Sequence, residues 1–248
     1  GYIPSDQLYV FSPDSQKVMF KKARRFTRSE MMVMEMLSTN QWKRPMYFAV
    51  TIGSDYHLGL DPYLELTGLA YRITPERSKN GKPRVNTEVM YDNMLHKFKY
   101  GNMNVPDIYI DENTMRMCRT HRMMFCQLAE ALYDEKQYDK ALEVLDFAEE
   151  MLPGYNVPYD YTSATMASLY YSMDKMDKGN AIMSKLADNC VEYMVWGASL
   201  DPIQRKGVQS TLGHHSAVLG YVLNNLQRFE QKELFNKYFD LYNQYADR

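Results

Sequence analysis

The pattern of apolar and polar positions divides the chain into two parts. Residues 2 to about 110 carry short runs of β-branched and aromatic residues between polar turns, whereas residues from about 112 to 245 carry apolar residues at helical spacing almost throughout. The first pattern predicts a small α/β module over residues 2–110, and the second predicts an all-α domain over residues 111–248. The predicted fold class is therefore α+β.

Local signals place several elements in the first part. Thr27 and Glu30 form a capping-box pattern that starts a helix, and Asn86 or Thr87 caps a second helix. The run from Met46 to Val50 is apolar on both faces, which predicts a strand that is covered on both sides. Strands are predicted where β-branched and aromatic residues crowd together, at residues 17–22, 46–52 and 68–74.

The second part carries a repeated pattern that resembles tetratricopeptide (TPR) repeats. Small residues such as Ala129 and Ala141 allow the two helices of a hairpin to approach closely, and the pattern predicts three helical hairpins. The first unit has Phe125, Leu128, Ala129, Tyr138, Ala141, Leu145, Ala148 and Pro153. The second unit has Ala167, Tyr170, Met176, Gly179, Met183 and Leu186. The third unit has Leu219, Gly220, Leu223, Phe229, Leu234, Tyr238, Leu241 and Tyr245.

Stacked TPR hairpins have a concave face that is lined by the first helix of each pair. Tyrosines beside polar groups suit extended peptides, because the rings give contact area and the polar groups satisfy the peptide backbone. The sequence therefore predicts a face that binds a peptide or protein. Its predicted residues are Glu130, Tyr133, Asp134, Tyr161, Ser168, Tyr171, His214, Tyr221 and Asn224.

A series of landmarks begins in the segment from Asn40 to Val50 and passes through Gly59-Leu60-Asp61 and the run from Gly68 to Pro75. The series continues through Met90-Tyr91-Asp92-Asn93, Phe98-Lys99-Tyr100-Gly101, Tyr109-Ile110-Asp111-Glu112 and Leu128-Ala129-Glu130-Ala131-Leu132. These landmarks resemble the C-terminal region of a family of large bacterial membrane proteins that is grouped with the protein O-mannosyltransferases of the GT-C type. The resemblance covers roughly residues 16 to 153.

This resemblance implies a non-catalytic C-terminal domain of a membrane protein that transfers sugars to Ser or Thr of acceptor proteins. The family's catalytic carboxylate lies in the membrane-embedded part, and no position here matches it, so no catalytic residue is carried over. The expected role is either to bind acceptor proteins or peptides or to brace the membrane domain, so the expected partners are the upstream transmembrane domain and acceptor proteins or peptides. The expected location is the periplasmic face of the inner membrane.

Two alternatives stay open. The first is an independent enzyme that acts on glycans, with paired carboxylates among Asp55 and Asp61 or among Asp107, Asp111 and Glu112. Since the latter acids directly precede a helix, helix capping is the favoured interpretation for them. The second alternative is a general TPR scaffold. A candidate sugar-contact patch has Trp42, Arg44, Tyr47, Asp55 and Tyr56, although structural roles are favoured for these residues.

Composition narrows the functional classes. The net charge of −2 argues against nonspecific nucleic-acid binding, and the basic cluster at residues 21–25 is interpreted as a solvated turn. No run of about 18 apolar residues predicts a membrane span. Cys118, Cys126 and Cys190 are interpreted as buried packing residues, and no metal or cofactor is expected. Because the chain begins at Gly1 without a Met, we expect a piece of a longer protein.

Overall fold

The computed structural model describes residues 8–20 and 26–245. The chain divides into two compact units, residues 1–99 and 100–248, and each is described by itself. The predicted boundary lay after residue 110. The intervening segment belongs to the helical unit because the Tyr100 ring lies 5.7 Å from that of Phe125, and the Asn156 side chain donates to the carbonyl oxygens of Met103 and Val105.

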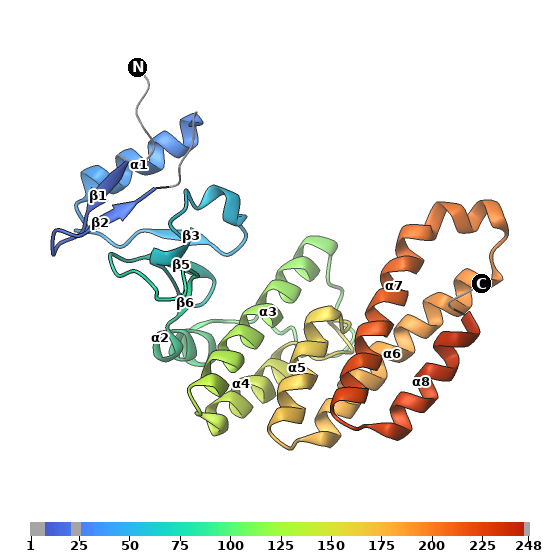
Figure 1. Ribbon diagram of the computed structural model, residues 1–248. Helices are drawn as coiled ribbons and strands as arrows, with labels where there is room; N and C mark the ends of the chain where they lie inside the picture. The colour runs from blue at the N-terminus through green and yellow to red at the C-terminus, as the bar shows by residue number, and fades with distance from the viewer. Residues whose placement is uncertain (1–7, 21–25, 246–248) are drawn as a thin grey trace. The chain divides into compact units, whose positions relative to one another are not determined.

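Within the described residues, the N-terminal unit contains a two-stranded sheet, a four-stranded sheet, two α-helices and two short 3₁₀ helices at Ser54–Tyr56 and Asp61–Tyr63 (Figure 1). The antiparallel pair is β1 (Tyr9–Phe11) and β2 (Lys17–Met19). The four-stranded sheet has the order β3-β5-β4-β6, in which β4 and β6 are parallel and the other neighbours antiparallel. Its strands are β3 (Tyr47–Ala49), β5 (Ala70–Ile73), β4 (Leu64–Leu66) and β6 (Arg84–Val85).

The predicted caps start both helices of this unit. Helix α1 (Arg28–Asn40) begins with the capping box of Thr27 and Glu30. Helix α2 (Thr87–Asp92) begins where the Asn86 side chain accepts from the N–H of Val89, and it continues as a π-helical turn over Asn93–Lys97.

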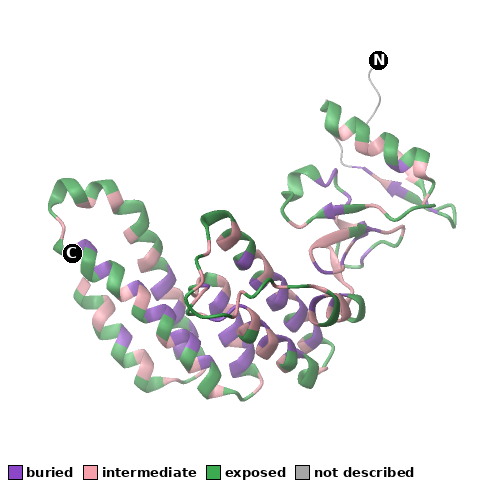
Figure 2. Ribbon diagram, turned by 180° about the vertical axis from the view of Figure 1, so that it is seen from behind, coloured by how far each residue is buried: buried purple, intermediate pink, exposed green. Residues whose placement is uncertain are grey.

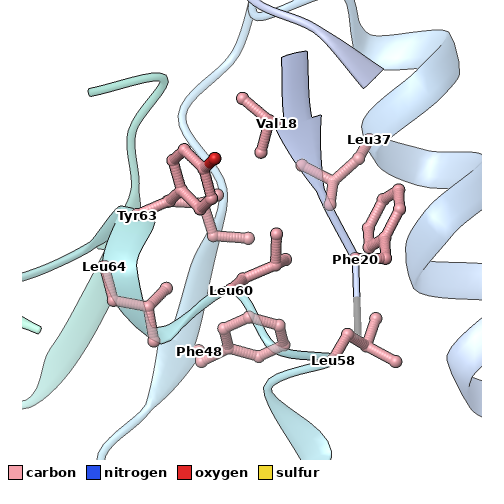
Figure 3. Packing of buried hydrophobic residues seen from close by; sticks show 9 residues of the cluster. Val18, Phe20, Leu37, Phe48, Leu58, Leu60, Tyr63 and Leu64 are labelled. Carbon is pink, nitrogen blue, oxygen red and sulfur yellow. The ribbon is translucent and has the colours of Figure 1, made fainter. Parts of the chain in front are cut away.

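A core of buried apolar side chains lies within the N-terminal unit. Figure 3 shows side chains from β2, α1, β3 and the segment before β4 pointing toward one another. Its buried residues are Val18, Phe20, Leu37, Phe48, Leu58, Leu60, Tyr63, Leu64 and Ile73. The burial of these apolar side chains is the main stabilising contribution to a unit with short strands.

The predicted strands are only partly correct. β3 and β5 lie within the predicted ranges, and β2 covers the described start of the range 17–22. The prediction that the strand around Phe48 is covered on both sides is wrong, because Tyr47 and Ala49 are exposed and only Phe48 is buried. β3 is an edge strand with one buried face, which is typical of an antiparallel pairing.

The helical unit contains three antiparallel hairpins in chain order, as Figure 1 shows. Tyr138 and Met176, which belong to the repeated pattern, begin α4 and α6, and Phe229 of the third unit follows α7 directly. The predicted fold class is confirmed, whereas no finding tests the TPR likeness of the hairpins. The helices are α3 (Glu112–Asp134), α4 (Tyr138–Met151), α5 (Tyr161–Ser172), α6 (Met176–Ser199), α7 (Pro202–Arg228) and α8 (Lys232–Tyr245).

Small residues permit the close contacts inside these hairpins, whose buried stripes appear in Figure 2. Ala129 and Ala141 are fully buried in the first hairpin. A Cβ built on Gly179 would lie 2.4 Å from Cε1 of Tyr171, so only glycine fits at this position without movement of the ring. This contact accounts for a glycine at this position of the second unit.

Candidate binding site

Helices α3, α5 and α7, the first helices of the three hairpins, are packed in sequence: α3 contacts α5, and α5 contacts α7. We call their outward surface the first-helix face, defined by the predicted residues other than Tyr171 together with Gly213, Ala217 and Gly220. Of the predicted residues, five are exposed, namely Glu130, Asp134, Tyr161, His214 and Asn224. Tyr133, Ser168 and Tyr221 are half-buried.

Contacts between α5 and α7 bring several of these side chains together. The rings of Tyr161 and Tyr221 lie 4.5 Å apart between centroids. The Ser168 hydroxyl donates to Oδ1 of Asn225 at 2.8 Å. The pKa of Tyr161 is raised. The larger cause is loss of solvent around its hydroxyl group, and the smaller cause is the neighbouring Tyr221. The two helices therefore present a tyrosine pair whose members are still partly open to solvent.

Tyr171 lies away from this surface. Its side chain is 2% exposed, its hydroxyl donates to Oδ1 of Asn180 at 2.8 Å, and its ring lies 4.9 Å from that of Phe229. The missing Cβ of Gly179 gives the ring its space. Tyr171 is thus a packing residue between α5, α6 and the end of α7, and a ligand on the first-helix face does not reach it.

One side of α7, which we call its bare side, carries no large side chain at four successive positions. Gly213, Ala217, Gly220 and Asn224 follow one another at spacings of three or four, so they share a face of the helix. Gly213, Ala217 and Asn224 are exposed and Gly220 is half-buried. A Cβ built on Gly213 or Gly220 would meet no atom within 4 Å. A helical glycine costs roughly 0.5–1 kcal/mol relative to alanine, and no packing within the described chain accounts for these two.

The residues of the candidate sugar-contact patch come from separate elements of the N-terminal unit. Trp42 is half-buried, and its indole N–H donates to the carbonyl oxygen of Phe11 at 2.6 Å. Arg44 and Asp55 are exposed, and Tyr47 and Tyr56 are 51% and 68% exposed. Among the described residues, no ring contact joins the three aromatic side chains. Instead, Trp42 lines a cavity of about 370 Å³ with Tyr9, Val10, Phe11, Ser12, Pro13, Leu37, Ser38 and Gln41.

A second cavity, of about 520 Å³, lies in the helical unit, and sequence reasoning did not find it. We call it the acid–lysine pocket. Its lining residues are Asp146 and Glu149 from α4, Tyr159, Tyr170 from α5, and Lys178, Ala181, Ile182 and Lys185 from α6. Oδ1 of Asp146 accepts from the Tyr170 hydroxyl at 2.8 Å and pairs with Nζ of Lys178 at 2.5 Å.

Glu149 is the other acid of this pocket. Its Oε2 accepts from the Tyr159 hydroxyl at 2.6 Å, whereas its Oε1 is buried and has no hydrogen-bond partner. Burial raises the pKa of the Glu149 carboxyl, and the Tyr159 hydroxyl, Arg122 and Lys185 act in the opposite direction. Since burial is the largest effect, the ionised form is less stable here than in water.

Arg122 supports the loop that carries Tyr159. Its guanidinium is fully buried and donates to three backbone carbonyl oxygens, of Leu152, Val157 and Pro158, at 2.7 to 3.1 Å. The guanidinium carbon also lies 5.3 Å from the centre of the Tyr159 ring. The sequence contains part of the information that points to this pocket. The spacing of the charged residues places Asp146 and Glu149 on one face of α4, and Lys178 and Lys185 on one face of α6.

The structure offers no binding or catalytic role for the remaining candidate residues that it describes. Asp111 caps α3 by accepting from the N–H groups of Asn113 and Thr114, as the capping interpretation expects. Cys118, Cys126 and Cys190 are buried, and none forms a disulfide. No group of three or more His, Cys, Asp and Glu that could hold a metal occurs in the described residues. The basic cluster at residues 21–25 lies outside them.

Comparisons with known proteins give one similarity. The family model for TMEM260-associated domain 2 matches residues 6–92, which is 87 of the 248 residues. The match is consistent with an accessory domain of a TMEM260-like membrane protein. No curated protein and no solved structure matches the chain. Within the described residues, we find no helix with the length and apolar character needed to span a bilayer.

Proposed function

We propose that this chain is a non-catalytic accessory part of a larger membrane protein, and that its first-helix face binds a peptide or protein segment. The match of residues 6–92 to a domain named for its association with TMEM260 supports the first part of the proposal. The bare side of α7 beside the Tyr161–Tyr221 pair carries the second part.

The chemistry of the first-helix face suits a peptide. Where Gly213 and Gly220 leave the α7 backbone uncovered, another chain can approach closely. Tyr161 and Tyr221 offer ring area at low entropic cost, and the exposed Asn224 offers an amide donor and acceptor for a peptide backbone.

The resemblance to protein O-mannosyltransferases narrows the proposal. In this form, the bound segment belongs to an acceptor protein that is glycosylated on Ser or Thr, and the domain works at the periplasmic face of the inner membrane beside its own transmembrane domain. The acidic side chains Glu130 and Asp134 of α3 then favour acceptor segments with basic residues, because opposite charges steer association.

The test uses fluorescence anisotropy with labelled Ser- and Thr-containing peptides, some of which carry lysine. The variant Ala217→Trp places a bulky ring on the bare side of α7 and is expected to weaken binding at least tenfold, or about 1.4 kcal/mol. The control variant Asn236→Trp adds the same ring at an exposed position of α8. Equal binding by both variants contradicts the proposed location. If the unmodified chain binds no peptide, peptide binding itself is contradicted.

A further inference from the structure

Two charged groups of the acid–lysine pocket lack an ion-pair partner. Asp146 and Lys178 pair with each other at 2.5 Å. For Glu149 and Lys185, by contrast, the described residues provide no oppositely charged group within 4.0 Å. Among the described residues, Oε1 of Glu149 is buried without any hydrogen bond, and Nζ of Lys185 lies 5.9 Å from the centre of the Tyr159 ring.

The formal charges of the pocket balance, because two carboxylates face two ammonium groups. A ligand of a single charge would therefore satisfy one of the two unpaired groups and leave the other without a partner. The cost of a missing partner falls on Glu149, whose Oε1 is buried, whereas Lys185 is exposed and its ammonium group stays solvated until an anionic group pairs with it. A ligand with both charges satisfies both groups and keeps the pocket neutral.

We propose that the acid–lysine pocket binds a small zwitterion, whose ammonium group donates to Oε1 of Glu149 and whose anionic group pairs with Nζ of Lys185. The volume of about 520 Å³ lies within the usual range for small-molecule sites, roughly 300 to 1,000 Å³. Free α-amino acids and the phosphoethanolamine headgroup of a lipid share this chemistry.

Neighbouring contacts hold the Glu149 carboxylate in place before a ligand binds. The Tyr159 hydroxyl fixes Oε2 of Glu149 and leaves Oε1 as the acceptor. Arg122 holds the loop that carries Tyr159 through bonds to the backbone carbonyl oxygens of residues 152, 157 and 158. Such preorganisation lowers the entropic cost of binding.

The experiment is isothermal titration calorimetry of the full chain with a panel of common α-amino acids and with phosphoethanolamine. For the tightest amino acid, the N-acetyl derivative lacks the ammonium group and the amide lacks the carboxylate. Each derivative is expected to bind at least about tenfold more weakly than its parent. Binding of amino acids, of phosphoethanolamine or of both supports the proposal and identifies the source of the zwitterion.

Variants test the roles of Glu149 and Lys185, the two groups that would pair with the ligand. Lys185→Gln and Glu149→Gln are each expected to weaken binding about tenfold, whereas Lys206→Gln, an exposed position on α7, leaves it unchanged. Glutamine at 149 retains an acceptor for Tyr159, and Lys185 is exposed, so both variants are expected to fold, which thermal unfolding checks. Absence of binding by the whole panel overturns the proposal, as does an unchanged affinity for either singly charged derivative or for Lys185→Gln.

Discussion

The Tyr159 hydroxyl donates a 2.6 Å hydrogen bond to Oε2 of Glu149, and this bond joins α4 to the residue just before the N-cap of α5. Glu149 belongs to the first hairpin and Tyr159 leads into the second. The bond therefore contributes to the connection between two hairpins whose sequences are separated by a loop. The carboxyl that accepts it is poorly solvated, since its other oxygen is buried without a partner.

The first prediction concerns the pH dependence of stability. Burial raises the pKa of Glu149 above its ordinary value of 4.5, so the folded chain retains this proton to a higher pH than the unfolded chain does. The contribution of Glu149 to stability is thus fully present below pH 4.5 and is lost as the pH rises through the folded-state pKa.

The variant Glu149→Gln removes this titration and retains an acceptor for Tyr159. We therefore compare the free energy of unfolding of the variant with that of the unmodified chain. We expect the difference, variant minus unmodified chain, to become more positive as the pH rises from 4.5 to neutral. Urea unfolding at a series of pH values measures the difference. A difference that is constant with pH would show that Glu149 has the same pKa in both states.

The second prediction compares two glycines. Gly179→Ala is expected to destabilise the chain by about 1–3 kcal/mol, because the new Cβ would lie 2.4 Å from the buried ring of Tyr171. Gly213→Ala is expected to stabilise it by about 0.5–1 kcal/mol, because nothing lies within 4 Å and alanine favours the helix. Chemical unfolding of both variants checks the signs. Stabilisation by both substitutions would contradict the close packing of Gly179.

The third prediction concerns the buried guanidinium. Arg122→Met leaves the carbonyl oxygens of Leu152, Val157 and Pro158 without their donor. The bonds to Leu152 and Val157 are buried, and each buried group without a partner costs about 1–3 kcal/mol, so we expect a loss of at least about 2 kcal/mol in the free energy of unfolding. Arg119→Met, at an exposed position with a distant contact of 3.8 Å to Asp160, is the control and is expected to cost less than about 1 kcal/mol. Similar losses for both variants would show that the carbonyl contacts contribute little.

The sequence predicts local features well. The caps at Thr27, Asn86 and Asp111 are confirmed, because a cap depends on residues within one turn of the helix. By contrast, the short strands β1, β4 and β6 were not predicted, because strands of two or three residues are defined by pairing with distant segments.

The candidate sites also combine features that depend on local sequence with features that depend on distant segments. Exposure along α7 follows from helical periodicity, so His214 and Asn224 lie at the surface as expected. The burial of Tyr171 depends on Gly179 and Phe229, which come from other parts of the chain. The acid–lysine pocket combines α4, α5 and α6, and the unpaired state of Glu149 is visible only once these helices are packed.

The binding affinity of Ala217→Trp for the labelled peptides, measured against that of Asn236→Trp, tests the central claim most directly. If the first-helix face holds the peptide, the ring on α7 weakens binding at least tenfold, or about 1.4 kcal/mol, while the ring on α8 has no effect. The same affinity for both variants, or a loss for the α8 variant alone, would contradict a peptide site on this face.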